Sequence, residues 1–199
     1  IKIEDSLSME EACLFSCAVM TGVGAVLNTA QVPVGATVAV VGLGGVGLNA
    51  ILAAKMLGAE KIIAVDTRDS KLALARELGA THGFNAKDPQ CVEAVRDVTR
   101  GGVDYAFEAA GSVDAMDVTY RITRRGGTSV SSGLSHPTHM FSLSHLSLVA
   151  EERTIKGSYM GSCIPSRDIP RYISMYQRGL LPIDKLISSK IALDDINQA

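Results

Sequence analysis

The 199-residue sequence has no tryptophan, and its aromatic residues amount to only 5%. Its four cysteines include no Cys-x-x-Cys pair; they are Cys13, Cys17, Cys91 and Cys163. No apolar run, free of charge, reaches the ~18 residues that a membrane-spanning helix needs, and no signal peptide is recognisable. Without a secretory context we expect reduced thiols, a cytoplasmic protein and no membrane partner.

Charge of either sign is not in excess. The 19 basic and 21 acidic side chains give a net charge of −2, which argues against nucleic acid as a standing partner. An apolar content of 47% with 20% charged residues is ordinary for a globular α/β domain. The chain starts at Ile1 without Met and stops inside what reads as a helix start at 194–199, so we expect a fragment of a longer protein.

What is present is organised around one stretch, from Thr37 to Asp66. A β-branched run predicts a buried strand at 37–41, and a helical pattern that stops at Gly58 leads to a second strand at 61–65. Asp66 follows that second strand directly. Between the first strand and the helix, the pattern G-x-G-x-x-G is matched by Gly42, Gly44 and Gly47.

Each part of this stretch has a physical role in holding a dinucleotide. Gly42 allows the tight turn, Gly44 lets a pyrophosphate approach a backbone without a Cβ, and Gly47 lets the helix pack near the sheet. Unpaired N–H groups at the helix start favour phosphate, and Asp66 can accept hydrogen bonds from both ribose hydroxyls of the adenosine half. The alternative is a tight strand-to-helix turn in an α/β protein that binds no ligand.

Strands and helices alternate along the rest of the chain. The patterns predict strands at 81–85, 103–109, 128–133 and 153–160, and helices at 8–28, 69–78, 88–99, 113–123, 145–151 and 166–177. Residues 140–144 and 190–193 read as short extended pieces, and Arg124 and Arg125 as the basic end of a helix. We therefore predict an α/β Rossmann fold: a doubly wound, six-stranded parallel sheet of order 3-2-1-4-5-6 with helices on both faces.

Five motifs stand out along this pattern. They are CLFSCAVMTGVG at 13–24, VGLGGVGL at 41–48, VD at 65–66, FEAAG at 107–111 and TIKGS at 154–158. Together they resemble the zinc-dependent alcohol dehydrogenases of the medium-chain dehydrogenase/reductase family. The resemblance implies one NAD(P)-binding domain over 1–199, with 1–30 as the connecting helix from a GroES-like catalytic domain that this chain lacks. Two zinc ligands, the structural-zinc lobe and most of the substrate pocket would lie in that missing domain.

The resemblance gives three residues of the first motif different roles. Cys17 matches the third catalytic zinc ligand, although a cysteine on an apolar helix face is more often a core residue. Cys13 matches no ligand, and we expect it to be core. Thr21 falls where the family contacts the nicotinamide side of the site; the alternative is a threonine bonding back to a helix carbonyl. No metal-ligand position is matched by His136, His139 or His145.

The same resemblance assigns cofactor contacts. Gly45 and Val46 would lie against the pyrophosphate and the nicotinamide, and Lys71 would reach the adenosine ribose, with a solvated lysine as the alternative. Ala109 and Ala110 would line the crevice at the carboxyl edge of the sheet, while backbone groups of four later positions would hold the carboxamide. The complete predicted set is Gly42, Gly44, Gly45, Val46, Gly47, Asp66, Thr67, Lys71, Ala109, Ala110, Ser132, Leu134, Ser158 and Met160.

The implied activity is hydride transfer between an alcohol or aldehyde and NAD, with zinc as Lewis acid. One alternative is a zinc-free quinone or enone reductase of the same family, against which Cys17 in its motif argues. Another is a non-enzymatic NAD-sensing module, which leaves the motif at 13–24 without a purpose. Asp66 predicts NAD over NADP, because its charge would meet the 2′-phosphate, although Arg68 can favour that phosphate.

Two further expectations concern the chain by itself. We expect it to bind NAD weakly and to oxidise no alcohol, because the zinc site would be incomplete. We also expect a homodimer joined through the sheet edge at the sixth strand, since an unpaired edge is a liability and the family's cofactor domains pair this way. The alternative is a short edge covered by its own loop.

Overall fold

The computed structural model describes residues 7–198 and contains, within them, one six-stranded sheet of order β3-β2-β1-β4-β5-β6. Its strands are β1 (Thr37–Val41), β2 (Lys61–Asp66), β3 (His82–Asn85), β4 (Val103–Glu108), β5 (Thr123–Ser131) and β6 (Thr154–Gly157). Every neighbouring pair is parallel. The predicted Rossmann topology is confirmed, including the reversal of strand order beside β1.

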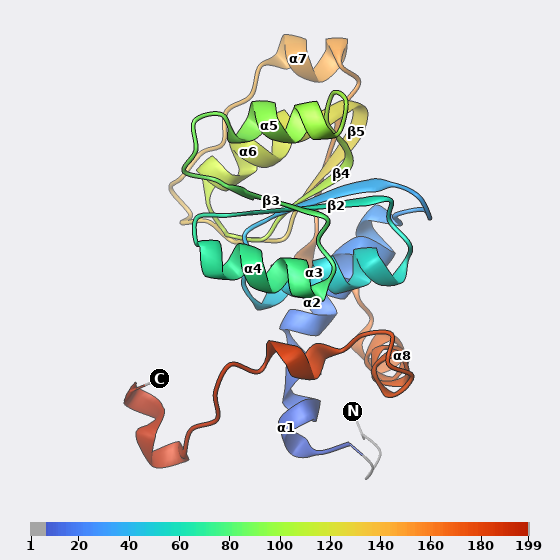
Figure 1. Ribbon diagram of the computed structural model, residues 1–199, viewed down its shortest axis with the longest axis vertical. Coiled ribbons are helices and arrows are strands. Elements are labelled where there is room, and N and C mark those ends of the chain that lie inside the picture. Colours follow the sequence, from blue (N-terminus) through green and yellow to red (C-terminus); the bar gives the residue numbers. More distant parts are fainter. Residues whose placement is uncertain (1–6, 199) are drawn as a thin grey trace.

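Helices cover both faces of this sheet (Figure 1). One face carries α2 (Ala18–Gly24), α3 (Gly45–Met56) and α4 (Asp69–Leu78), and the other carries α5 (Cys91–Val98) and α6 (Val113–Ile122). Successive strand residues point to opposite faces, so Val38 and Val40 of β1 join the core with α3, whereas Ala39 and Val41 join the core with α5. Burial on both faces is why the first strand reads as an uninterrupted apolar run.

The segment predicted as one helix over 8–28 is broken, so that prediction is wrong. Its start at Ser8 is as predicted and is a capping box: the Glu11 N–H donates to Ser8 Oγ at 3.2 Å, and the Ser8 N–H donates to Glu11 Oε2 at 3.1 Å. Cys17 interrupts the helix with φ −138° and ψ −72°. The pieces are α1 (Met9–Ala12), a 3-10 turn (Cys13–Ser16), α2 and a π-helical turn (Ala25–Ala30).

The two glycines of α2 allow close packing, which offsets the cost of glycine inside a helix. A Cβ on Gly22 would lie 2.2 Å from the carbonyl oxygen of Val46 in α3. A Cβ on Gly24 would lie 2.5 Å from the carbonyl oxygen of Gly161. Helix α2 is therefore pressed against both α3 and the segment that follows β6.

Two predicted boundaries on the α5–α6 face are wrong. Helix α5 begins at Cys91 and not at 88, because Asp88 Oδ1 accepts the Gln90 N–H at 2.9 Å in a turn before the helix. Strand β5 begins directly after α6, so the two arginines lie in a strand and do not end a helix. There Arg124 pairs with Asp104 of β4, with 2.6 Å between Nε and Oδ1.

The last third of the chain has less regular structure than the patterns predicted. Residues 140–144 and 190–193 form no strand, and β6 covers only part of the predicted 153–160. Before β6 lies α7 (His145–Ala150); after it come a 3-10 turn (Tyr159–Ser162), α8 (Pro165–Gln177) and two further 3-10 turns (Ile183–Leu186 and Leu193–Gln198).

No single helix between residues 7 and 198 is long and apolar enough to cross a membrane. Within this described part, one pair of pieces, Met9–Ser16 and Ala18–Ala30, reaches that length and composition together, but it is bent by 50° at its junction.

Candidate functional site

The turn after β1 lies at the carboxyl edge of the sheet, where the strand order reverses. Gly42 has φ +92°, the left-handed region that favours glycine, and its N–H donates to the carbonyl oxygen of Val65 at 2.9 Å. A Cβ on Gly47 would lie 1.9 Å from the carbonyl oxygen of Gly42. The fold itself therefore requires glycine at both positions.

Gly44 differs from these two glycines. Its φ of −74° and ψ of −168° are an extended conformation that any residue can adopt, and a Cβ built on it would meet no atom within 4 Å. Gly44 is also the N-cap of α3, so the unpaired amide groups of that helix begin beside it. Nothing in the described fold requires glycine here, whereas a phosphate that approaches the helix start would.

Asp66, at the end of β2, is only 9% exposed and supports the turn. Its Oδ2 accepts the Leu43 N–H at 2.7 Å, and its Oδ1 accepts the Arg68 N–H at 3.0 Å. A carboxylate has about four acceptor positions, so about two remain for hydroxyl groups of a ligand. The guanidinium of Arg68 is largely exposed, and its Nε lies 3.9 Å from Oδ1.

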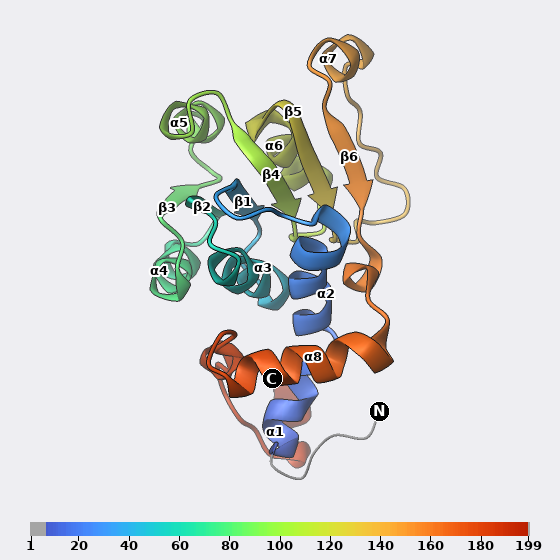
Figure 2. The same ribbon diagram turned by 90° about the vertical axis from the view of Figure 1, so that its right-hand side faces the viewer.

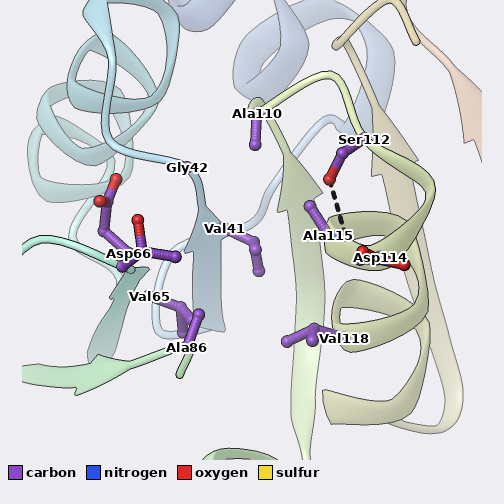
Figure 3. Close-up of a pocket in the computed structure, with 11 residues that line it drawn as sticks. Val41, Gly42, Val65, Asp66, Ala86, Ala110, Ser112, Asp114, Ala115 and Val118 are labelled. Carbon is purple, nitrogen blue, oxygen red and sulfur yellow. Dashed lines mark hydrogen bonds between the residues drawn. The ribbon is translucent and has the colours of Figure 1, made fainter. Parts of the chain in front are cut away.

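A cavity of about 340 Å³, which we name the β2 cavity, opens beside Asp66 (Figure 3). Figure 3 shows apolar side chains lying between Asp66 on one side and Ser112 and Asp114 on the other. An apolar slot with a carboxylate at its rim can take a planar base and bind the attached sugar. The lining residues are Val41, Gly42, Val65, Asp66, Thr67, Ala86, Ala110, Ser112, Asp114, Ala115 and Val118.

Sequence reasoning named Gly42, Asp66, Thr67 and Ala110 among these lining residues. It missed Ala86 and the wall formed by α6, because no local pattern shows which helix face meets the end of β1. The one available signal was Ser112, whose Oγ accepts the Ala115 N–H at 3.1 Å and so caps α6 at the cavity.

A second cavity, of about 430 Å³, is named here the α2 cavity. It brings together eight of the predicted site residues, from segments far apart in the sequence. Ala110 lines both cavities, which therefore meet at the carboxyl edge of the sheet. The lining residues are Cys17, Thr21, Val46, Ala109, Ala110, Gly111, Ser132, Gly133, Leu134, Tyr159 and Met160.

Glu108, which sequence reasoning overlooked, ties two loops of the α2 cavity together. Its carboxylate is 1% exposed, and Oε1 accepts the N–H groups of Ala110 at 2.8 Å and Gly111 at 2.6 Å. Oε2 accepts the Ser131 hydroxyl at 2.9 Å and the Gly133 N–H at 3.2 Å. The available signal was an acid that directly follows the buried apolar residues Ala106 and Phe107 at the end of β4. A carboxylate buried there needs hydrogen-bond partners.

The first motif is placed only partly as predicted. Cys17 and Cys13 are both exposed, so the prediction of Cys13 as a core residue is wrong. The broken helix turns Cys13 outward, where its Sγ donates to the Glu10 carbonyl oxygen at 3.1 Å. Thr21 is buried in α2, and its Oγ1 forms no hydrogen bond with any residue from 7 to 198. The alternative of a bond back to a helix carbonyl is therefore not what the structure has.

Zinc does not fit the residues that are present. Between residues 7 and 198, no three His, Cys, Asp or Glu side chains come close enough to hold a metal ion. A catalytic zinc needs three protein ligands, and Cys17 offers one thiol. The rings of His136 and His139 lie 5.3 Å apart, on the loop before α7, without a third ligand beside them.

Five predicted cofactor residues line neither cavity. Three of them are glycines at the start of α3: Gly44, Gly45 and Gly47. The other two are Lys71 and Ser158. Lys71 lies in the first turn of α4. Ser158 is buried, its N–H donates to the Ser131 carbonyl oxygen at 2.8 Å, and its Oγ is hydrogen-bonded to Thr29 Oγ1 at 2.8 Å. Sequence reasoning also missed Tyr159, which lines the α2 cavity beside Met160.

Comparisons with known proteins identify the relatives of this chain. A family model described as zinc-binding dehydrogenase matches residues 45–178. Alcohol dehydrogenase 3 of Hordeum vulgare is 37% identical over 201 residues, which cover 100% of this chain and 53% of the relative. The S-(hydroxymethyl)glutathione dehydrogenase of Paracoccus denitrificans is 35% identical, over 99% of this chain and 54% of the relative. The chain thus spans about half the length of the curated relatives it matches.

Solved structures show the same relationship. The benzyl alcohol dehydrogenase of Acinetobacter calcoaceticus superposes with a TM-score of 0.96 at 35% identity, over 100% of this chain and 54% of that one. A zinc-binding dehydrogenase of Sinorhizobium meliloti 1021, solved with NADP bound, superposes with a TM-score of 0.89 at 25% identity, over 100% and 57%. Since the family model covers more than half of the sequence, the chain belongs to the zinc-binding dehydrogenase family.

Proposed function

We propose that this chain is the NAD-binding domain of a zinc-dependent alcohol dehydrogenase, and that residues 1–30 connect it to a GroES-like catalytic domain. The observation that carries the proposal is Gly44, a glycine with ordinary dihedral angles and open space where its Cβ would be. A fold without a ligand has no use for glycine there. The alcohol dehydrogenases among the relatives favour this function over the zinc-free reductase.

The two cavities suit the two halves of a dinucleotide. The β2 cavity would hold adenine between apolar side chains, with the ribose hydroxyls on the remaining acceptor positions of Asp66. The pyrophosphate would lie at Gly44, against the amide groups and the positive end of α3. The nicotinamide would lie in the α2 cavity against Val46, near Thr21 and Cys17, with backbone groups of Ser132, Leu134 and Met160 in reach of the carboxamide. Ser158 would take no direct part, because it lies outside the cavity and its N–H donates to Ser131.

NAD would be preferred to NADP. Asp66 is buried and bonded to two backbone N–H groups, so its carboxylate cannot turn away from a 2′-phosphate. Arg68 lies 3.9 Å from the carboxylate and is mostly exposed, which leaves it able to reduce but not to reverse the repulsion. Lys71 would contribute from the exposed side of the same ribose.

In the complete enzyme, bound NAD would accept the hydride from the alcohol. The residues of this chain would bind and orient it: Glu108 fixes the loops on both sides of the α2 cavity, and Thr21 offers a hydroxyl that has no other partner. Cys17 would be one of three zinc ligands, the other two coming from the missing domain. The substrate would be an alcohol or aldehyde, and the protein would be cytoplasmic. The assembly would be a homodimer joined through β6, whose residues are all exposed.

Calorimetric titration of the 199-residue chain tests the proposal. We expect it to bind ADP-ribose and NAD with similar, weak affinity, because the adenosine and pyrophosphate contacts are complete while one wall of the nicotinamide site is missing. With zinc added, no simple alcohol should yield NADH. If neither ADP-ribose nor NAD binds at millimolar concentration, the proposed function is refuted. Zinc-dependent oxidation of an alcohol by this chain alone would show that the active site lies elsewhere.

A further inference from the structure

The segment between β6 and α8 has an unusual backbone. Met160, Gly161 and Ser162 have φ values of +48°, +68° and +50°, three left-handed residues in succession. This conformation is unfavourable for a residue with a Cβ, so surrounding contacts must maintain it. Met160 and its neighbour Tyr159 line the α2 cavity, which means that the strained backbone shapes part of that cavity.

The contacts that maintain it come from the π-helical turn Ala25–Ala30. Such turns are rare and occur frequently at functional sites. Thr29 Oγ1 is hydrogen-bonded at 2.8 Å to Ser158 Oγ and also at 2.8 Å to Ser162 Oγ. One hydroxyl therefore joins Ser158, two residues before the left-handed segment, to Ser162 at its end.

Asn28, the preceding residue, holds the middle of the segment. Its Nδ2 donates to the Gly161 carbonyl oxygen at 3.2 Å and lies 3.3 Å from both Cys163 Sγ and the Tyr172 hydroxyl. At Gly24 a Cβ would lie only 2.8 Å from the Cα of Gly161, so the two backbones are in direct contact. Figure 2 shows α2 side by side with the segment that leads from β6 to α8.

We propose that Asn28 and Thr29 are positioning residues for the nicotinamide end of the cofactor. Neither lines the α2 cavity; both act through the left-handed segment, which holds Tyr159 and Met160 in the wall that Thr21 also lines. One continuous piece of chain, α2 with its π-helical turn, thus carries one part of the cavity wall and fixes another. The proposal rests on the proposed function, because it takes the α2 cavity as the nicotinamide site.

The test removes single hydroxyl groups. Thr29→Val keeps the shape of the side chain and deletes both hydrogen bonds, while Thr29→Ser restores the hydroxyl. Ser162→Ala deletes one of the two bonds at an exposed position, where folding is not at risk. The matched control is Thr99→Val at the end of α5, since the half-buried Thr99 Oγ1 donates to the Val95 carbonyl oxygen at 2.6 Å and accepts the Gly102 N–H at 3.1 Å.

Two measurements separate the two ends of the cofactor. Calorimetry with ADP-ribose reports the adenosine end, and the emission of bound NADH, compared at saturation with free NADH, reports the surroundings of the dihydronicotinamide ring. In Thr29→Val we expect the change in emission to fall to about half or less, with the ADP-ribose dissociation constant within about twofold of the unmutated chain. Ser162→Ala should show a smaller fall, while Thr29→Ser and Thr99→Val should match the unmutated chain.

Three results would overturn the inference. The first is that NADH bound to the unmutated chain emits as free NADH does. The second is that neither Thr29→Val nor Ser162→Ala changes the emission of bound NADH. The third is that the ADP-ribose affinity of Thr29→Val falls together with the emission, as a general loosening of the fold would cause. If Thr29→Val does not fold, Ser162→Ala decides. Failure of the unmutated chain to bind ADP-ribose would instead refute the proposed function.

Discussion

Gly44→Ala is the substitution that separates what the fold needs from what the cofactor needs. The residue has φ −74° and ψ −168°, and the added Cβ would meet no protein atom within 4 Å. Alanine can therefore occupy the position without strain. If the pyrophosphate lies against this backbone, the same Cβ occupies its space.

The expected change in stability is small because two effects oppose each other. Alanine reduces the freedom of the unfolded chain and stabilises by about 0.4–1 kcal/mol. Alanine is also a poorer N-cap than glycine, which costs on the order of 0.5–1 kcal/mol. The net effect should stay within about 1 kcal/mol, a shift of about 2–4 °C in Tm for a chain of this size.

The expected change in affinity is large. Charge-assisted hydrogen bonds from backbone N–H groups to phosphate contribute about 1.5–3 kcal/mol. Keeping the phosphate away from the start of α3 should raise the dissociation constants of ADP-ribose and NAD about 10- to 100-fold. Both ligands should be affected equally, since they share the pyrophosphate.

Thermal unfolding and calorimetry measure the two effects on the same samples. Gly157→Ala is the matched control, because Gly157 also has open space and no positive φ but lies on the edge strand β6. Gly47→Ala is the opposite case: its Cβ would lie 1.9 Å from the Gly42 carbonyl oxygen, and we expect a loss of about 3 kcal/mol in stability. Unchanged ADP-ribose affinity in a folded Gly44→Ala protein would refute the placement of the pyrophosphate.

Three further predictions follow from named contacts. Asp66→Ser should narrow the preference for NAD over NADP by about 1.5–3 kcal/mol, and equal dissociation constants for the two cofactors in the unmutated chain would contradict it. Hydrogen bonds from Arg167 hold the pKa of the buried Asp168 carboxyl below its usual value, so this carboxylate stabilises the fold above about pH 4 and its contribution is lost as pH falls through the lowered pKa. Asp168→Asn should therefore lower Tm at neutral pH and make Tm less dependent on pH in the acid range. A Tm that changes with pH as steeply as in the unmutated chain would disprove this. Sedimentation should show a dimer, and a monomer throughout the micromolar range would exclude pairing through β6 for this chain.

The reversal of strand order at β1 and the turn that follows it could be predicted because local rules act there. A turn that needs φ > 0 needs glycine, as at Gly42, and a helix that crosses close to a strand excludes a Cβ, as at Gly47. Alternation of strands with helices then restricts the sheet to few topologies. Asp66 could be placed as well, because the end of β2 meets the turn after β1 in any such sheet.

Tertiary structure alone decided the break at Cys17, the exposure of Cys13 and the part of the β2 cavity wall that α6 forms. The helical pattern around Cys17 continues through the break, since apolar spacing reports which face is buried and not whether the backbone changes direction there. Glu108 and Thr29 gained their roles from partners far along the chain, Gly133 and Ser162 respectively. Such contacts form only once the sheet has assembled and brought distant segments together. The sequence determines what each residue can donate or accept, and the tertiary packing determines which partner it meets.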